Sequence, residues 1–270
     1  MASSAHTPDR DKLSVVTATL AMALLSGYFV HLPAWGTVLR LPGVVIPFRL
    51  SVSGLMALLI AALTVAGVDW VLADHPALEG RPALPHWLLP ALTAWVLEVF
   101  LQHLPGGVIW WAALFLGLGL WFLVFVAEYV AVDGEDPRYP LAAAGLTGLG
   151  FLLFFLLIAA LRSAGVRLFF SAPAVGGAAA LVALRTLNLQ QHGRWQPVEA
   201  LFIFAIAAQL EAAFHYLPIP PTAFALLLAA TTYAAVVYLS NLLEGQAPAQ
   251  AALEPAGVLV LLLLLLPWAW

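Results

Sequence analysis

The sequence has no cysteine and very little charge. Its 270 residues include ten Lys and Arg and fourteen Asp and Glu, so charged residues make up 9% of the chain, whereas a soluble domain has about 25%. The lack of cysteine excludes disulfides, thiolate metal ligands and cysteine nucleophiles. The scarcity of basic residues leaves no patch that could bind nucleic acid, and we expect no nucleic-acid partner.

Lysine and the common catalytic motifs are also scarce or missing. The one lysine, Lys12, precedes the first apolar run, which excludes a retinal Schiff base inside a helix bundle. The H-E-x-x-H, G-x-S-x-G and P-loop patterns are absent. Glu211 and His215 are four positions apart, whereas carboxylate-bridged dimetal bundles use a Glu and a His three apart. We expect no metal, no cofactor and no catalytic residue; a porphyrin-type pigment held by His31, His103 or His215 is the least favoured alternative.

Apolar residues dominate the chain. They make up 63% of it, and the mean hydropathy is +0.99. Apolar runs of about 20 residues recur, which is the length that crosses the hydrocarbon core of a bilayer. The runs are continuous rather than alternating, so helices are favoured over a β-barrel. The sequence therefore predicts an all-α, polytopic membrane helix bundle with 8–9 transmembrane helices, whose first partner is the lipid bilayer.

Eight spans and a C-terminal apolar segment can be placed. Pro42, Gly43 and Pro47 interrupt the apolar stretch 36–47, which we interpret as an interfacial or partly re-entrant linker. The segment 256–270 is short for a span, and an interfacial or re-entrant segment is its alternative. The predicted spans are 13–35, 48–72, 87–104, 108–132, 141–161, 168–187, 198–217 and 222–243.

Two nine-residue stretches indicate an internal repeat. Leu97–Pro105 reads LEVFLQHLP, and Leu210–Pro218 reads LEAAFHYLP, 113 positions later. At this offset residues 79–105 align with 192–218 without gaps and share eight identities. We expect a parallel tandem repeat of four helices, with coincidence between similar helix ends as the alternative. The expected organisation is a polar tail 1–12, a first repeat 13–132, an acidic linker 133–140, a second repeat 141–243, and a linker with a hydrophobic segment over 244–270.

Each repeat contains a glutamate inside a predicted span. Glu98 and Glu211 precede their prolines by seven residues, which places them roughly 10 Å below the turn. A charge near mid-membrane costs about 2.5–3.5 kcal/mol and is usually functional or paired. Gln102 and His215 follow their glutamates by four positions and share a helix face with them. The candidate intramembrane polar site comprises Glu98, Gln102, His103, Gln209, Glu211 and His215.

Three functions could explain these residues. The first is a small transporter or lipid-handling protein that binds a small-molecule or lipid substrate in a polar site between the repeats. The second is a non-catalytic membrane subunit or scaffold, in which the same residues hold helices together and other membrane subunits are the partners. An enzyme that uses Glu and His as acid and base is the weakest, because no nucleophile accompanies them.

The membrane orientation is weakly marked. An N-terminus in the cytoplasm places six Lys and Arg on the inside and four on the outside, in the direction of the positive-inside rule. We expect a multi-pass protein of the cell (inner) membrane with a cytoplasmic N-terminus.

Overall fold

The computed structural model describes the backbone of residues 9–29, 35–41, 44–50, 52–78, 83–191 and 193–265, and the side chains of 9–29, 55–78, 83–102, 104–191 and 193–264. Within these residues the chain is predominantly helical, and eight helices are long and apolar enough to cross a membrane. The prediction of a helical membrane protein is confirmed at the level of eight candidate spans; the ninth span and the tandem repeat stay predictions. The chain divides into two compact units, residues 1–142 and 143–270, and the division falls in the first turn of a helix that begins at Tyr139.

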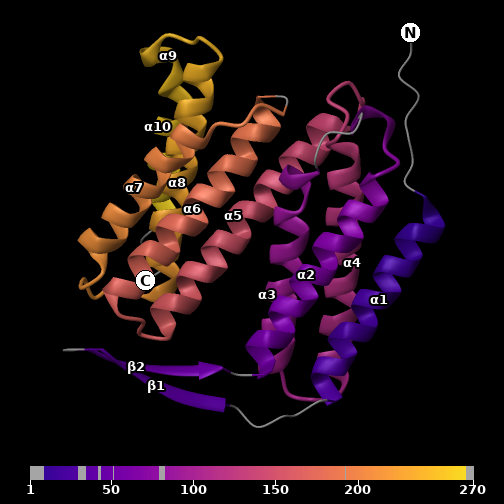
Figure 1. Cartoon of the computed structure of the whole chain (residues 1–270). Helices are drawn as coiled ribbons and strands as arrows, with labels where there is room; N and C mark the ends of the chain where they lie inside the picture. Colours follow the sequence, from indigo (N-terminus) through magenta and orange to yellow (C-terminus); the bar gives the residue numbers. More distant parts are fainter. Residues whose placement is uncertain are drawn as a thin grey trace. The chain divides into compact units, whose positions relative to one another are not determined.

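Unit 1 is a bundle of four long helices (Figure 1). Helix α2 packs mainly on α3, while α1 contacts each of the other three. Two short 3-10 helices, Pro76–Leu78 and Leu84–His86, lie between α2 and α3. The four helices are α1 (Arg10–Phe29), α2 (Val52–Leu72), α3 (Leu88–His103) and α4 (Val108–Val130).

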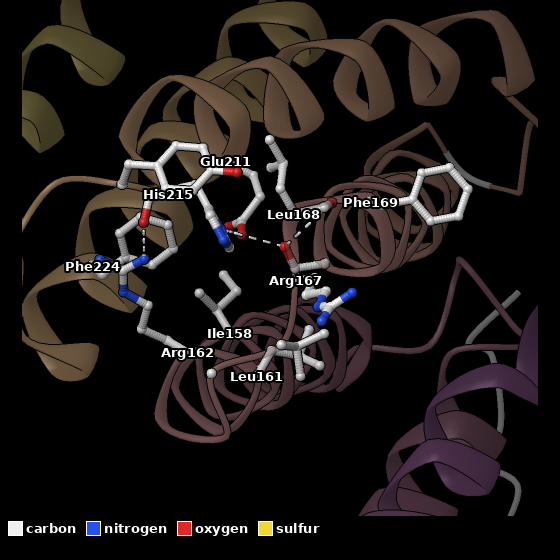
Figure 2. A pocket seen from close by; sticks show the side chains of 13 residues that line it. Ile158, Leu161, Arg162, Arg167, Leu168, Phe169, Glu211, His215 and Phe224 are labelled. Carbon is white, nitrogen blue, oxygen red and sulfur yellow. Dashed lines mark hydrogen bonds and ion pairs between the residues drawn. The ribbon is translucent and has the colours of Figure 1, made fainter. Parts of the chain in front are cut away.

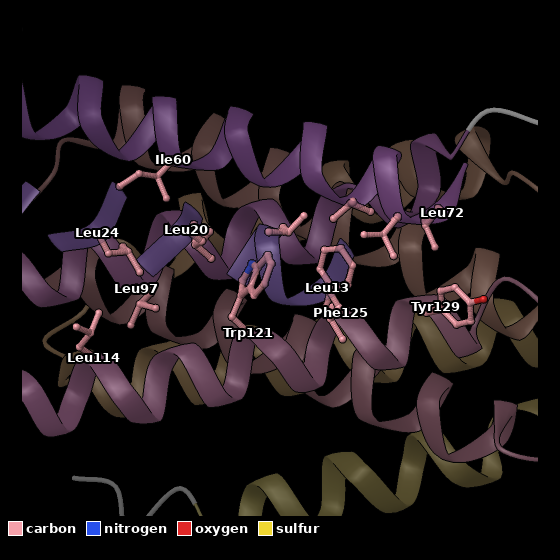
Figure 3. Packing of buried hydrophobic residues seen from close by; sticks show 14 of the residues in the cluster. Leu13, Leu20, Leu24, Ile60, Leu72, Leu97, Leu114, Trp121, Phe125 and Tyr129 are labelled. Atoms are coloured by element: carbon pink, nitrogen blue, oxygen red, sulfur yellow. The ribbon is translucent and has the colours of Figure 1, made fainter. Parts of the chain in front are cut away.

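The core of unit 1 joins all four helices along their length. Leu20 and Leu24 of α1, Ile60 of α2 and Trp121 and Phe125 of α4 are among its most buried side chains (Figure 3). Each is at most 1% exposed. Because lipid is as apolar as these side chains, such a core is held by close packing rather than by exclusion of water.

The stretch between α1 and α2, expected as a linker over 36–47, forms a β-hairpin, a structure that was not predicted; its interfacial or re-entrant position stays a prediction. Strands β1 (Trp35–Leu41) and β2 (Val44–Leu50) pair antiparallel, with Trp35 opposite Leu50 and Leu41 opposite Val44. The predicted first span therefore ends too late and the second begins too early. Apolarity does not distinguish a short strand from a helix end, whereas the concentration of β-branched residues favours the strand.

Unit 2 contains four further long helices and a short C-terminal pair. Helix α6 packs extensively on α7, and α8 contacts α6, α7 and α10. Phe154 and Ile158 of α5 enter the same core as Val175 and Ala179 of α6 and Phe224 of α8. The helices are α5 (Tyr139–Ser163), α6 (Leu168–Gln190), α7 (Pro197–Phe214), α8 (Pro221–Leu243), α9 (Pro248–Ala251) and α10 (Leu253–Leu265).

Prolines mark where several helices of unit 2 begin. Pro197, Pro221 and Pro248 occupy the first helical position of α7, α8 and α9, where a missing N–H costs nothing and the fixed φ suits the helix. Helix α10 has 13 residues, about 20 Å at 1.5 Å per residue. This described part is shorter than a hydrocarbon core of about 30 Å, and the ninth span stays a prediction.

Candidate functional site

A cavity of about 700 Å³ lies at one end of the unit 2 helices. It is surrounded by the C-terminal end of α5, the turn into α6, the C-terminal end of α7 and the first turns of α8 (Figure 2). Phe169 and Tyr216 at its rim are 80% and 81% exposed, so the cavity reaches the surface. The side chains used below are Arg162, Arg167, Ser171, Glu211, His215 and Phe224.

The α5–α6 turn forms one wall of the cavity because a glycine ends α5 there. Gly165 has φ +61°, a left-handed conformation that glycine adopts without strain. Its N–H donates to the carbonyl of Arg162, and the next N–H, of Val166, donates to the carbonyl of Leu161. This closing pattern reverses the chain within four residues. It places Arg162 at the end of α5 and Arg167 immediately before α6, both on the cavity.

Glu211 is the buried acid of the cavity. It is 3% exposed, and its Oε1 lies 3.1 Å from Nδ1 of His215, one helical turn later. Its second oxygen, Oε2, is buried and has no hydrogen-bond partner among the described residues. A buried carboxylate oxygen without a donor is costly, and here it belongs to a side chain that lines a cavity.

Ser171 of α6 extends this polar group. Its Oγ lies 3.5 Å from Nδ1 of His215, the same ring nitrogen that faces Glu211. A Ser-His-acid relay needs the serine and the acid on opposite ring nitrogens, so that the imidazole can pass a proton between them. In this arrangement Ser171 and Glu211 compete for one nitrogen, and the geometry favours binding over nucleophilic catalysis.

Arg162 closes the end of α7. Its guanidinium donates to the backbone carbonyls of His215 and Leu217, and its Cζ lies 4.6 Å from the ring centroid of Phe224 in α8. The last carbonyls of a helix have no partner within the helix, and the planar fork of an arginine can satisfy two at once. Arg162 therefore holds α5, α7 and α8 together at this end.

Arg167 differs from Arg162 in its contacts. It is exposed, it lines the cavity, and its guanidinium has no hydrogen-bond or ion-pair partner among the residues whose side chains are described. Its five donors are free for a ligand.

The corresponding pair of unit 1 is enclosed. Glu98 is 1% exposed, and its Oε1 accepts a hydrogen bond of 2.7 Å from Nε2 of Gln102. Helix α1 covers the carboxylate: a Cβ added at Gly27 would lie 2.4 Å from Oε1. Glu98 thus lies against the α1 backbone at a position where only glycine leaves room.

The structure places the six predicted site residues in different settings. The Glu98–Gln102 and Glu211–His215 pairs are both formed, each within its own unit. Gln209 is exposed and does not line the unit 2 cavity. The side chain of His103 lies outside the described residues. A site shared by the two halves stays a prediction.

Two features were missed in the sequence. Arg162 and Arg167 were not among the predicted site residues; their position on both sides of a short turn was the available signal for a cation pair. The second is a buried pair in unit 1, where Nδ1 of His86 lies 2.8 Å from Oε2 of Glu128. These residues are 8% and 1% exposed, and 42 positions separate them, so no local pattern could connect them.

Comparison with known proteins identifies a family. Residues 32–269 match the family described as "Protein of unknown function (DUF5656)". The chain belongs to this family. No curated protein and no solved structure matches it. With eight apolar helices, this DUF5656 member is a multi-pass membrane protein, and its family carries no assigned activity. No cluster of metal-ligating side chains is present among the described residues.

Proposed function

We propose that the protein binds and handles an amphiphilic substrate, a lipid or a lipid-like small molecule, in the unit 2 cavity. The observation that carries the proposal is the combination of an uncommitted Arg167 and a partly unpaired Glu211 in one cavity with apolar walls. A cavity of about 700 Å³ is within the range of about 300–1,000 Å³ typical of small-molecule sites.

The position of the cavity supports an amphiphile. It lies where α5 and α7 end and where α6 and α8 begin, which in a membrane is the level of the lipid head groups. The apolar side chains around it include Ile158, Leu161 and Phe224. A substrate with a polar head and an apolar body would match both parts of this lining.

Unit 1 supports the alternative role, a non-catalytic membrane subunit that binds other membrane proteins. The buried His86–Glu128 pair joins the segment before α3 to the end of α4. The Glu98–Gln102 bond lies within α3, and Glu98 packs against Gly27 of α1. We propose that unit 1 is the structural part and unit 2 the binding part of the chain.

We further propose that the two units descend from a parallel duplication and that the N-terminus is cytoplasmic in the cell (inner) membrane. The Glu-x-x-x-Gln and Glu-x-x-x-His pairs near the ends of α3 and α7 support the first point. With eight spans, a cytoplasmic N-terminus puts the unit 2 cavity on the outer face. The cysteine-free sequence allows a direct test: an impermeant maleimide added to intact cells should label Tyr216→Cys and leave Glu135→Cys unlabelled. The reverse pattern would contradict this orientation.

The binding proposal is tested by filling the cavity. Val166→Trp places a large side chain in the turn that lines it, whereas Leu201→Trp adds the same side chain to a 66% exposed position on α7. Mass spectrometry of lipid extracted from the purified proteins should show amphiphile retained by the wild type and by Leu201→Trp, and lost from Val166→Trp. Equal retention by all three proteins would contradict binding in this cavity. If Val166→Trp also loses transport of the same amphiphile across a membrane, transport is identified as the function.

A further inference from the structure

We infer that the substrate head group in the unit 2 cavity carries a phosphate diester next to a primary ammonium group, as in phosphatidylethanolamine. The inference rests on the proposed function and specifies its substrate class. The juxtaposition that carries it is a free guanidinium and a half-unpaired buried carboxylate on the walls of one cavity.

The carboxylate requires a ligand that donates hydrogen bonds. Oε2 of Glu211 is buried and has no partner among the described residues, while Oε1 is held by His215. A primary ammonium has three N–H donors and a positive charge, so it would satisfy Oε2 and neutralise the carboxylate. A quaternary ammonium has the charge without a donor and would leave Oε2 unsatisfied.

The arginines require an anion in the same cavity. Arg167 is exposed and uncommitted, and it directly precedes α6, whose first N–H groups and macrodipole also favour negative charge. Arg162 donates hydrogen bonds to the carbonyls of His215 and Leu217, and its positively charged side chain also lines the cavity. An arginine fork matches phosphate as well as carboxylate, and phosphate is the anion that a membrane phospholipid supplies.

Simpler ligands fit less well. A purely anionic head group would bring a second negative charge toward Glu211. A divalent cation needs six or more oxygen ligands for Ca²⁺ or near-octahedral geometry for Mg²⁺, and Glu211 is the single carboxylate among the described residues that line the cavity. The lining therefore matches a group with both charges, an anion for the arginines and a donor-bearing cation for Glu211.

Lipid selectivity of the full-length protein tests the inference. Phosphatidylethanolamine, phosphatidylcholine and phosphatidylglycerol with identical acyl chains are added to the detergent-purified protein, and binding is measured by native mass spectrometry. Phosphatidylethanolamine should bind about tenfold more tightly than the other two, because one hydrogen bond to a charged group is at stake. This ranking is read on the wild type and does not depend on any variant.

Variants then assign the two ends of the head group. Glu211→Gln should abolish the preference for phosphatidylethanolamine over phosphatidylcholine, and Arg167→Gln should weaken all three lipids about tenfold. Glu244→Gln and Arg194→Gln change exposed residues of unit 2 outside the cavity lining and should change nothing. Soluble glycerophosphoethanolamine is the last probe: binding as tight as the lipid identifies a free head group as the ligand, and weaker binding identifies the lipid.

Two outcomes overturn the inference. Equal binding of phosphatidylethanolamine and phosphatidylcholine by the wild type would show that no donor is recognised, while the proposed lipid binding would stand. A preference for phosphatidylethanolamine that survives in Glu211→Gln would show that another group recognises the ammonium. Binding of none of the lipids would instead contradict the proposed function itself.

Discussion

Each unit contains a glutamate bonded to a polar residue four positions later, Gln102 in unit 1 and His215 in unit 2, and the two glutamates lie in different surroundings. In unit 1, Glu98 is bonded to Gln102 and pressed against Gly27, so its carboxylate serves the packing of α3 on α1. In unit 2, Glu211 is bonded to His215, and its other oxygen has no partner where the side chain lines a cavity. An acid followed by a polar residue at i+4 is therefore no indication of function in itself. The difference on which the proposed roles rest is that the Glu98 carboxylate lies against α1, whereas Glu211 lines a cavity.

The units also differ in what holds their helices. Unit 1 is joined by the buried His86–Glu128 pair, which connects the 3-10 helix just before α3 to the end of α4. Unit 2 depends on Arg162, an arginine from α5 that satisfies the end of α7 and stacks on α8. This contrast predicts which substitutions reduce stability and which affect the binding of a ligand.

The largest expected effect on stability is in unit 1. His86→Ala leaves Glu128 buried with one partner fewer, and removal of one member of a buried pair costs about 3 kcal/mol. The apparent melting temperature of the detergent-purified protein should fall by several degrees. His86→Gln, which keeps a hydrogen-bond donor, should recover much of the loss. Equal melting temperatures of His86→Ala and the wild type would show that the His86–Glu128 pair does not stabilise unit 1.

The next effect separates the two arginines of unit 2. Arg162→Met should destabilise the protein by about 2 kcal/mol, because two carbonyls at the end of α7 lose a charged donor. Arg167→Met should leave the melting temperature unchanged, because the Arg167 guanidinium has no partner among the described residues. Thermal unfolding monitored by circular dichroism measures both. A larger loss for Arg167→Met than for Arg162→Met would reverse the roles assigned here.

A smaller effect tests how tightly Glu98 is covered. Gly27→Ala places a Cβ 2.4 Å from Oε1 of Glu98, and such overpacking costs about 1–3 kcal/mol. Gly177→Ala is the matched control on α6, since an added Cβ there meets nothing within 4 Å, and it should be neutral or slightly stabilising. In the double variant Gly27→Ala/Glu98→Ala the cost should largely disappear. An additive result would show that Gly27 and Glu98 do not interact.

The helices could be predicted from the sequence, while the difference between the two glutamates could not. A bilayer requires every backbone polar group to be satisfied locally, so long apolar runs identified the eight spans, and spacing identified both i+4 pairs. The β-hairpin was missed because 36–47 is apolar and broken by prolines, as a linker can be. The coverage of Glu98 by Gly27 and the approach of Arg162 to the carbonyl of His215 are contacts across 71 and 53 positions. Such contacts depend on how helices pack, which apolar periodicity does not specify.

The most direct test of the difference between the units compares Glu211→Gln with Glu98→Gln, because the same conservative change is made at both glutamates. Both proteins are purified under identical conditions, and the amphiphile they retain is quantified by mass spectrometry after extraction. Glu211→Gln should retain about tenfold less than the wild type, and Glu98→Gln should retain as much as the wild type. Equal retention by the two variants, or a loss confined to Glu98→Gln, would contradict the assignment of binding to unit 2 and of packing to unit 1.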